Sequence, residues 1–217
     1  MSSETITMNK NLITNIQLGL KRLLDVVICS VLLILLSPLL ALIGLIIKLT
    51  SPGPIFFVQE RVGMNGRIFR MLKFRTMNGT PNPNRRGWTK EEEARITKLG
   101  RLLRPYGFDE LPQLINIIKG DMSIIGPRAP LPIQVGSFSE YERRAFKMRP
   151  GVTGLSAIRG RYALTPEQRR RLNTEYVEQW SLGLDFKILL HTIIIVLTRK
   201  NSEERYYENT GDSTSSR

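Results

Sequence analysis

Two adjacent carboxylates, Asp109 and Glu110, lie in the part of the sequence that is richest in residues able to do chemistry, residues 102–128. A carboxylate pair at a helix N-terminus, with arginines nearby, can hold Mg²⁺ together with a diphosphate, or one carboxylate can attack phosphorus directly. The plainer interpretation is that Asp109 caps a helix and Glu110 favours its dipole. Four cations near the pair favour phosphate chemistry: Arg101, Arg104, Lys119 and Arg128.

The residues that follow predict a short helix that would begin at Asp109 and end at Gly120. Asp109 can serve as the N-cap, and Pro112 falls in the first turn, where its missing N–H leaves no helical partner unsatisfied. Glycine is common just past a helix C-terminus. The two carboxylates are therefore expected at the positive end of this helix, where positive surroundings should lower the pKa of Asp109 and keep it ionised. Its apolar stripe consists of Leu111, Leu114, Ile115 and Ile118.

The composition limits which other groups could take part. The chain has 217 residues, and 32 Lys and Arg against 19 Asp and Glu give a net charge of +13. Such a charge fits nucleic acid, acidic lipid head groups or phosphorylated substrates as partners. The single cysteine, Cys29, and the single histidine, His191, exclude a disulfide framework and argue against a histidine metal site or a Ser-His-Asp triad. Catalysis must then come from carboxylates, hydroxyls, cations or a bound metal.

A membrane segment is predicted by residues 26–47, which carry no charge. The run is long for a signal peptide, and no small-residue cleavage site follows it. A straight spanning helix is one interpretation. A re-entrant helix is the other, because Ser37 and Pro38 lie at the middle, where proline favours a kink, and both flanks are basic, beginning with Lys21 and Arg22. The residues themselves favour neither interpretation.

The remaining elements follow from local patterns. Residues 55–58 and 67–74 predict two short strands around a turn at 63–66. Glycines and prolines predict a loop over 78–88. A last apolar helix is expected over 181–199, either lying in the membrane interface or packed in a core. Capping boxes predict further helix starts at Thr89, for a helix reaching about Arg104, at Ser139 and at Thr165.

Several longer motifs, in a fixed order along the chain, carry a resemblance to a known family. They are Lys21-Arg22, Ser37-Pro38, and residues 51–63, 73–77, 109–116, 119–128, 149–155 and 176–181. From about Lys21 to Leu197 the chain resembles the small monotopic phosphoglycosyl transferases, the bacterial sugar transferase family. The sequence departs from the usual family pattern at Phe108, Ala129 and Ser156-Ala157.

The resemblance implies a reaction between a UDP-sugar and a polyprenyl phosphate, usually undecaprenyl phosphate. The products would be polyprenyl-diphosphate-sugar and UMP. Asp109 matches the family's nucleophile, which would form a covalent phosphosugar intermediate, and Glu110 matches its Mg²⁺-associated partner. The pair together would bind the metal. The Ser37-Pro38 pair matches the break of a re-entrant membrane helix, which favours re-entry over spanning, with Lys21 and Arg22 at the membrane flank.

Substrate-binding residues are expected partly from the resemblance and partly from local sequence patterns. Arg104, Pro127 and Arg128 match phosphate-binding positions, and Gln113 lies in the motif of the carboxylate pair. Lys73 and Arg75 share one face of a strand-like stretch and contact either substrate or solvent. Arg149, Arg159 and Arg161 flank a glycine-rich loop and are further candidates.

These observations predict an α+β fold in which helix dominates. A compact catalytic domain over 51–200 would sit at the cytosolic face of a bacterial inner membrane, on a re-entrant helix over 16–50, with interfacial amphipathic helices. Residues 1–15 and 201–217 are expected to be disordered. Membrane lipids are expected as partners, nucleic acid is not, and a homodimer is possible. The rival interpretation is a basic membrane-anchored protein that binds acidic lipid or nucleic acid without catalysis; a scaffold that has lost catalysis is less compatible with an intact Asp109-Glu110 pair.

Overall fold

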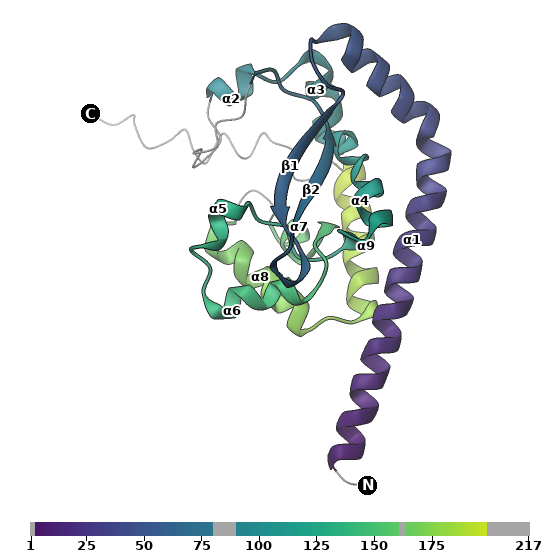
Figure 1. Cartoon of the computed structure of the whole chain (residues 1–217), viewed down its shortest axis with the longest axis vertical. Coiled ribbons are helices and arrows are strands. Elements are labelled where there is room, and N and C mark those ends of the chain that lie inside the picture. Colours follow the sequence, from purple (N-terminus) through teal and green to yellow (C-terminus); the bar gives the residue numbers. More distant parts are fainter. Residues whose placement is uncertain (1–2, 80–89, 161–163, 199–217) are drawn as a thin grey trace, which may run out of the picture.

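The computed structural model describes residues 3–79, 90–160 and 164–198. One long helix, α1 (Ser3–Thr50), lies along a compact body that contains the other elements (Figure 1). This body is built mainly of short helices and has two small sheets. The helix-dominant α+β class expected from the sequence is confirmed. The tail expected to be disordered lies outside the described residues.

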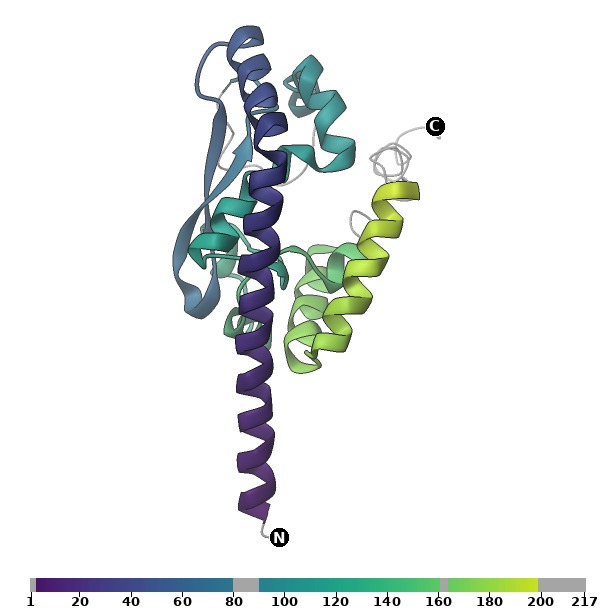
Figure 2. The same cartoon turned by 90° about the vertical axis from the view of Figure 1, so that its right-hand side faces the viewer.

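Helix α1 is longer than the sequence predicted. It already begins at Ser3, within the segment expected to be unstructured, because no glycine or proline interrupts the chain before Gly19 and a formed helix extends more easily than it nucleates. Its part from Asn15 to Thr50 is long and apolar enough to cross a membrane. In its second half the helix curves toward the rest of the body in Figure 1, whereas it runs straight in the perpendicular view of Figure 2.

Pro38 lies inside α1 without ending it. Proline has no N–H to donate, so the carbonyl four residues earlier, that of Ile34, loses its helical partner. The Ser37 hydroxyl donates to that same carbonyl at 2.7 Å. The Ser37-Pro38 pair therefore bends the helix while keeping its backbone acceptors satisfied.

The two predicted strands form an antiparallel hairpin. Strand β1 (Phe56–Val62) pairs with β2 (Ile68–Phe74) in a register that places Phe56 opposite Phe74 and Val62 opposite Ile68. The turn contains the 3-10 segment η1 (Met64–Gly66), in which Asn65 has a φ of 56°. The hairpin is confirmed, and most of the loop predicted to follow it lies outside the described residues.

The helix predicted to run to Arg104 is broken into two. Helix α2 (Lys90–Ala94) stops before Ile96, which forms an antiparallel bridge with Met77, and α3 (Lys98–Leu103) begins after it. Thr97 caps α3, because its side chain accepts from the Gly100 N–H at 2.9 Å. The proposed cap at Thr89 lies outside the described residues. The bridge between Ile96 and Met77, which follows β2, therefore interrupts the predicted helix.

Several short elements follow α3 and complete the body. They are η2 (Arg104–Tyr106), η3 (Phe108–Glu110), α4 (Gln113–Lys119), β3 (Ser123–Ile125), α5 (Pro132–Val135), α6 (Glu140–Arg143), η4 (Arg144–Lys147), β4 (Gly151–Thr153), α7 (Leu155–Ile158), α8 (Pro166–Glu178) and α9 (Leu182–Thr198). Strands β3 and β4 pair in parallel. The capping boxes predicted at Ser139 and Thr165 are confirmed at α6 and α8, and the last predicted helix is α9.

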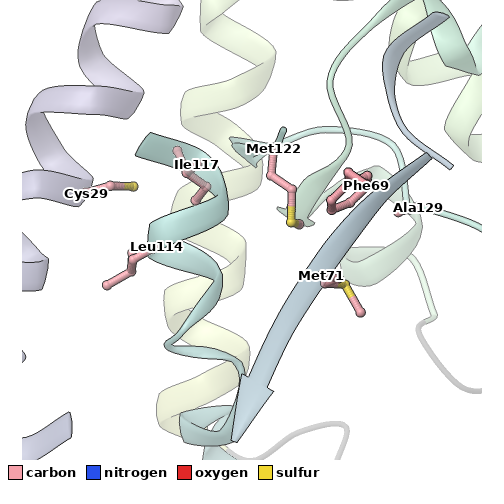
Figure 3. Packing of buried hydrophobic residues seen from close by; sticks show 7 residues of the cluster. All are labelled: Cys29, Phe69, Met71, Leu114, Ile117, Met122 and Ala129. Carbon is pink, nitrogen blue, oxygen red and sulfur yellow. The ribbon is translucent and has the colours of Figure 1, made fainter. Parts of the chain in front are cut away.

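Helix α1 contributes to two of the buried clusters. Figure 3 shows Cys29 of α1 facing Leu114 and Ile117 of α4, with Met122 and Phe69 deeper in the same cluster. Further along α1, Ile43 and Ile47 pack with Phe74 and Leu103. A third cluster joins β3, α7, α8 and α9 through Ile125, Leu155, Tyr176 and Ile188. The long helix is thus fastened to the body both before and after Pro38.

Candidate active site

The carboxylate pair lies on a 3-10 turn and not at the start of α4. Gly107 adopts a left-handed conformation, with φ 71°, and its carbonyl accepts from the Glu110 N–H, so that η3 forms. Pro112 is the residue that precedes α4, and no side chain caps that helix. The prediction that Asp109 is an N-cap is therefore wrong, because the turn uses backbone partners. The predicted stop at Gly120 is confirmed by its φ of 95°.

A lysine from the hairpin reaches this turn. Lys73 Nζ donates to Glu110 Oε1, and both side chains are partly buried. Arg104, on η2, is also close enough for its charge to act on Asp109. The structure thus brings together Lys73 of β2, Arg104 of η2, and Asp109 and Glu110 of η3.

Burial changes the acidity of Asp109. Loss of hydration, together with the negative charge of Glu110, raises its pKa from 3.8 to about 6, although Lys73 and Arg104 act in the opposite direction. The sequence predicted a lowered pKa from the neighbouring cations alone. That prediction is wrong, because desolvation outweighs those cations, and burial cannot be read from the charges along the chain.

Two more of the predicted substrate-binding residues, Gln113 and Arg75, are near these residues in the sequence but have different structural roles. Gln113 begins α4 and is buried. Arg75 turns toward the end of α1, where it donates to the carbonyls of Ser51 and Pro52 at 2.8 and 2.7 Å. Gly53 has a φ of +115°, and a β-carbon there would lie 2.3 Å from the Arg75 guanidinium. Arg75 therefore fastens the segment that joins α1 to the hairpin.

The remaining candidates lie away from the carboxylate pair. Arg149 Nε donates to the Gly120 carbonyl at 2.9 Å, at the far end of α4. The Arg128 N–H donates to Asn173 of α8, and its side chain is exposed, whereas Pro127 is buried. The segment that contains Pro127 and Arg128 lies next to the turn of the hairpin, because the Val62 N–H donates to the Pro130 carbonyl. Arg161 lies outside the described residues.

The donor set at the turn fits a magnesium ion. Mg²⁺ in proteins is commonly held by one or two carboxylates, with substrate phosphates and water completing its shell. Desolvation and, after it, repulsion from Glu110 raise the pKa of Asp109, and a divalent cation held by the two carboxylates would relieve that repulsion. Within the parts of the chain that the structure describes, no group of three or more His, Cys, Asp or Glu side chains gathers as a metal site.

The polar residues at the start of the membrane segment contact the body. Lys21 Nζ donates to Asp185 of α9 at 2.7 Å, and Tyr176 and Trp180 donate to the same carboxylate. Sequence reasoning placed Lys21 at the membrane flank and gave Asp185 no partner. An isolated aspartate inside an apolar helix was the available signal, because a buried charge needs a partner.

Two neighbours of Lys21 also bind the body. Arg22 donates to the carbonyls of Ile117 and Ile118, at 2.6 and 3.0 Å, where α4 ends. Asp25 accepts from the Ser123 hydroxyl and the Ile124 N–H at the start of β3. One face of α1 is thus joined through polar contacts to α4, β3 and α9.

Comparison with known proteins gives consistent matches. A family described as bacterial sugar transferase matches residues 16–199. The chain is 41% identical over 191 residues to the UDP-glucose:undecaprenyl-phosphate glucose-1-phosphate transferase of Caulobacter vibrioides, covering 84% of this chain and 71% of that one. It is 38% identical to the uncharacterized sugar transferase EpsL of Bacillus subtilis, covering 85% of this chain and 91% of EpsL. A glucose-1-phosphate transferase of Escherichia coli is also 38% identical, over 80% of this chain and 39% of its own length.

Proposed function

Because the chain belongs to the bacterial sugar transferase family, we propose that it transfers a sugar-1-phosphate from a UDP-sugar to undecaprenyl phosphate. The products are undecaprenyl-diphosphate-sugar and UMP, and the step begins the membrane stage of glycoconjugate synthesis. The relatives from Caulobacter vibrioides and Escherichia coli, named for this transfer with UDP-glucose, support the substrate class. The observation that carries the proposal is the partly buried Asp109 carboxylate, which interacts with the charges of Glu110, Lys73 and Arg104.

The first step is nucleophilic attack by Asp109. A carboxylate oxygen bonds to the phosphorus that carries the sugar, the bond from that phosphorus to the bridging oxygen breaks, and the bonding pair leaves with UMP. With a pKa of about 6, Asp109 is roughly 90% ionised at pH 7. Its partial burial also reduces the hydration of the attacking oxygen.

The second step regenerates the carboxylate. A phosphate oxygen of the lipid attacks the same phosphorus, and the bond to Asp109 breaks, with its electron pair returning to the carboxylate. The lipid phosphate is already anionic near neutral pH, so this step needs no strong general base. That requirement agrees with a chain that has one histidine, His191, which lies on α9.

The residues around Asp109 would neutralise the negative charge of the substrate phosphates. Arg104 would orient the phosphates, and Lys73 holds Glu110 in place beside the nucleophile. Asp109 and Glu110 would hold Mg²⁺, which when bound neutralises phosphate charge and polarises phosphorus. Gln113, Pro127, Arg128 and Arg149 remain proposed substrate contacts.

The contacts of α1 support a monotopic, re-entrant arrangement at the cytoplasmic face of the inner membrane. The same body binds α1 at Lys21 and again at Ile47. The intervening helix rises about 39 Å at 1.5 Å per residue, which exceeds a hydrocarbon core of about 30 Å. A helix crossing perpendicular to the membrane would place these two contacts on opposite sides. Apolar side chains stay exposed along the outer face of α1 and on α9, where lipid would cover them.

The covalent step is tested with purified protein, Mg²⁺ and a UDP-sugar, without the lipid. Intact-mass analysis should find a phosphosugar adduct on Asp109 and one equivalent of UMP in solution. Asp109→Asn should abolish both, while the matched control Glu140→Gln, an exposed carboxylate on α6, should abolish neither.

The outcomes separate the rival interpretations. An adduct on another residue, or UMP release only when both substrates are present, would assign the reaction to a different nucleophile or to direct transfer. If no UDP-sugar yields UMP in the presence of Mg²⁺ and lipid, the protein is a basic membrane-anchored binding protein and not an enzyme.

A further inference from the structure

An apolar groove lies beside the carboxylate pair. It has a volume of about 240 Å³ and runs between the second half of α1, the two paired ends of the hairpin and the start of α4. All of its lining residues are apolar. The ones that matter below are Ala41, Gly44, Phe56, Phe74, Pro112 and Ile115.

One end of the groove lies at the catalytic turn. Phe74 directly follows Lys73, and Pro112 comes two residues after Glu110. Two residues of chain span at most about 7 Å. The chain segments that carry Lys73 and Glu110 therefore lead directly into the lining of the groove.

The other side of the groove opens onto the apolar surface of α1. Leu45 lines the groove and is nevertheless 55% exposed, and the adjacent Leu42 is 53% exposed on the outer surface of the helix. Small residues at positions 41 and 44, one helical turn apart, keep this part of the helix narrow. A β-carbon on Gly44 would meet Ile55 at 3.3 Å, so the segment before β1 packs closely there. A hydrocarbon chain could pass from the bilayer into the groove without crossing water.

We propose that this groove binds the first isoprene units of the acceptor lipid, those next to its phosphate. The proposal rests on the transfer proposed above. An acyl chain of an ordinary phospholipid has the same apolar character, but the groove leads to a turn where Lys73, Arg104 and the nucleophile meet. That juxtaposition selects a lipid whose chain joins directly to a phosphate. Burial of the chain would also fix the attacking phosphate relative to Asp109.

The test fills the groove from α1. Ala41→Trp places an indole in the groove. The matched control, Leu42→Trp, places the same indole one residue further along α1, on its exposed outer surface. Ala41→Trp should raise the KM for undecaprenyl phosphate about tenfold or more, as expected when two or three buried methylenes lose their contacts. Leu42→Trp should leave that KM unchanged. Adduct formation with UDP-sugar alone, which needs no acceptor, reports whether each variant is folded.

The outcomes distinguish this proposal from the proposed function. Equal KM values in the two variants would overturn the groove assignment while leaving the transfer intact. Failure of the unsubstituted protein to form the adduct, or to turn over with lipid, would instead overturn the transfer.

A second measurement does not depend on substitutions. A short isoprenoid phosphate carrying a photoreactive diazirine should label peptides that contain residues 41–45, 56 or 112–115 in the unsubstituted protein. Undecaprenyl phosphate should compete for this labelling, and excess phosphatidylglycerol should not. Labelling confined to the outer face of α1, or competition by the phospholipid alone, would show that the groove holds a membrane acyl chain.

Discussion

At the scale of single residues, the acidity of Asp109 sets the pH range of the chemistry. The attacking form is the carboxylate, so single-turnover UMP release should fall as the pH drops through about 6, the pKa that burial and Glu110 impose. Lys73 lowers this pKa. Lys73→Gln should therefore move the midpoint of the rate profile to higher pH, and rapid-quench measurements between pH 5 and 9 would show it. A midpoint that stays in place would mean that another group controls the profile.

The ionised side chain of Asp109 should also lower the stability of the folded protein. Because the Asp109 pKa rises from 3.8 to about 6 on folding, the ionised carboxylate destabilises the fold. The cost is fully present above about pH 6 and disappears as the pH falls toward 3.8. Asp109→Asn should therefore raise the free energy of unfolding at pH 7.5 by about 1–3 kcal/mol, with a smaller gain at pH 4.5. Thermal unfolding in detergent at the two pH values checks this, with Glu140→Gln as control; an equal gain at both would contradict it.

Residue identities were more predictable than residue environments. The Asp109-Glu110 pair could be singled out from the sequence because adjacent acids among arginines are unusual. Its acidity was predicted in the wrong direction, because exposure depends on how η2, η3 and β2 pack. The cap was assigned wrongly for a similar reason, since the Glu110 N–H donates to the Gly107 carbonyl and forms a turn that the side-chain pattern does not encode.

At the scale of elements, the serine before Pro38 has a specific role. Its hydroxyl binds the Ile34 carbonyl, which the proline leaves without an amide partner. Ser37→Ala should destabilise the protein by about 1–3 kcal/mol if this exposed surface of α1 faces lipid, because lipid offers the Ile34 carbonyl no replacement donor. Ser37→Thr should restore stability. Unfolding in lipid nanodiscs measures both.

A matched control lies on the same helix. The Thr50 hydroxyl also binds a carbonyl, that of Ile46, but no proline removes the helical amide there. Thr50→Val should have a much smaller effect than Ser37→Ala. Equal losses would show that the hydroxyl at position 37 does not compensate for the proline.

The buried ion pair between α1 and α9 gives a second prediction for elements. Lys21 and Asp185 are 8% and 6% exposed. Lys21→Met leaves the Asp185 carboxylate without its cation and should cost about 3–5 kcal/mol. Adding Asp185→Asn removes the uncompensated charge, so the double variant should recover part of that loss. Chemical unfolding of both single variants and the double variant measures the coupling; additive losses would contradict it.

Elements defined by local pattern were predicted well, and long-range contacts were not. The hairpin, the two capping boxes at Ser139 and Thr165, and the last helix follow from residues within one or two turns of each other. The interruption near Ile96 requires its partner Met77, and the pair of Lys21 with Asp185 joins residues 164 positions apart. The hydrophobic pattern within one segment does not indicate contacts with a distant segment.

At the scale of the whole molecule, the positive charge of +13 and the two attachments of α1 lead to a topology prediction. In a Cys29→Ala background, single cysteines at Asn15 and Thr50 should both react with a membrane-impermeant maleimide in inside-out vesicles. Neither should react in right-side-out vesicles. Reaction of the two positions from opposite sides would establish a spanning helix and overturn re-entry.

The distance in sequence between Lys21 and Asp185 also bears on how the protein is made. Ribosomes add about 5–20 residues per second. The 164 residues that separate the partners therefore correspond to roughly 8–30 s of synthesis. For most of that interval α1 has been made while Lys21 lacks the Asp185 carboxylate, and Tyr176 and Trp180 are added only shortly before that carboxylate. Nascent chains stalled before Asp185 should accordingly hold α1 in a looser association with the bilayer, and seating of the anchor should be among the last events of biogenesis.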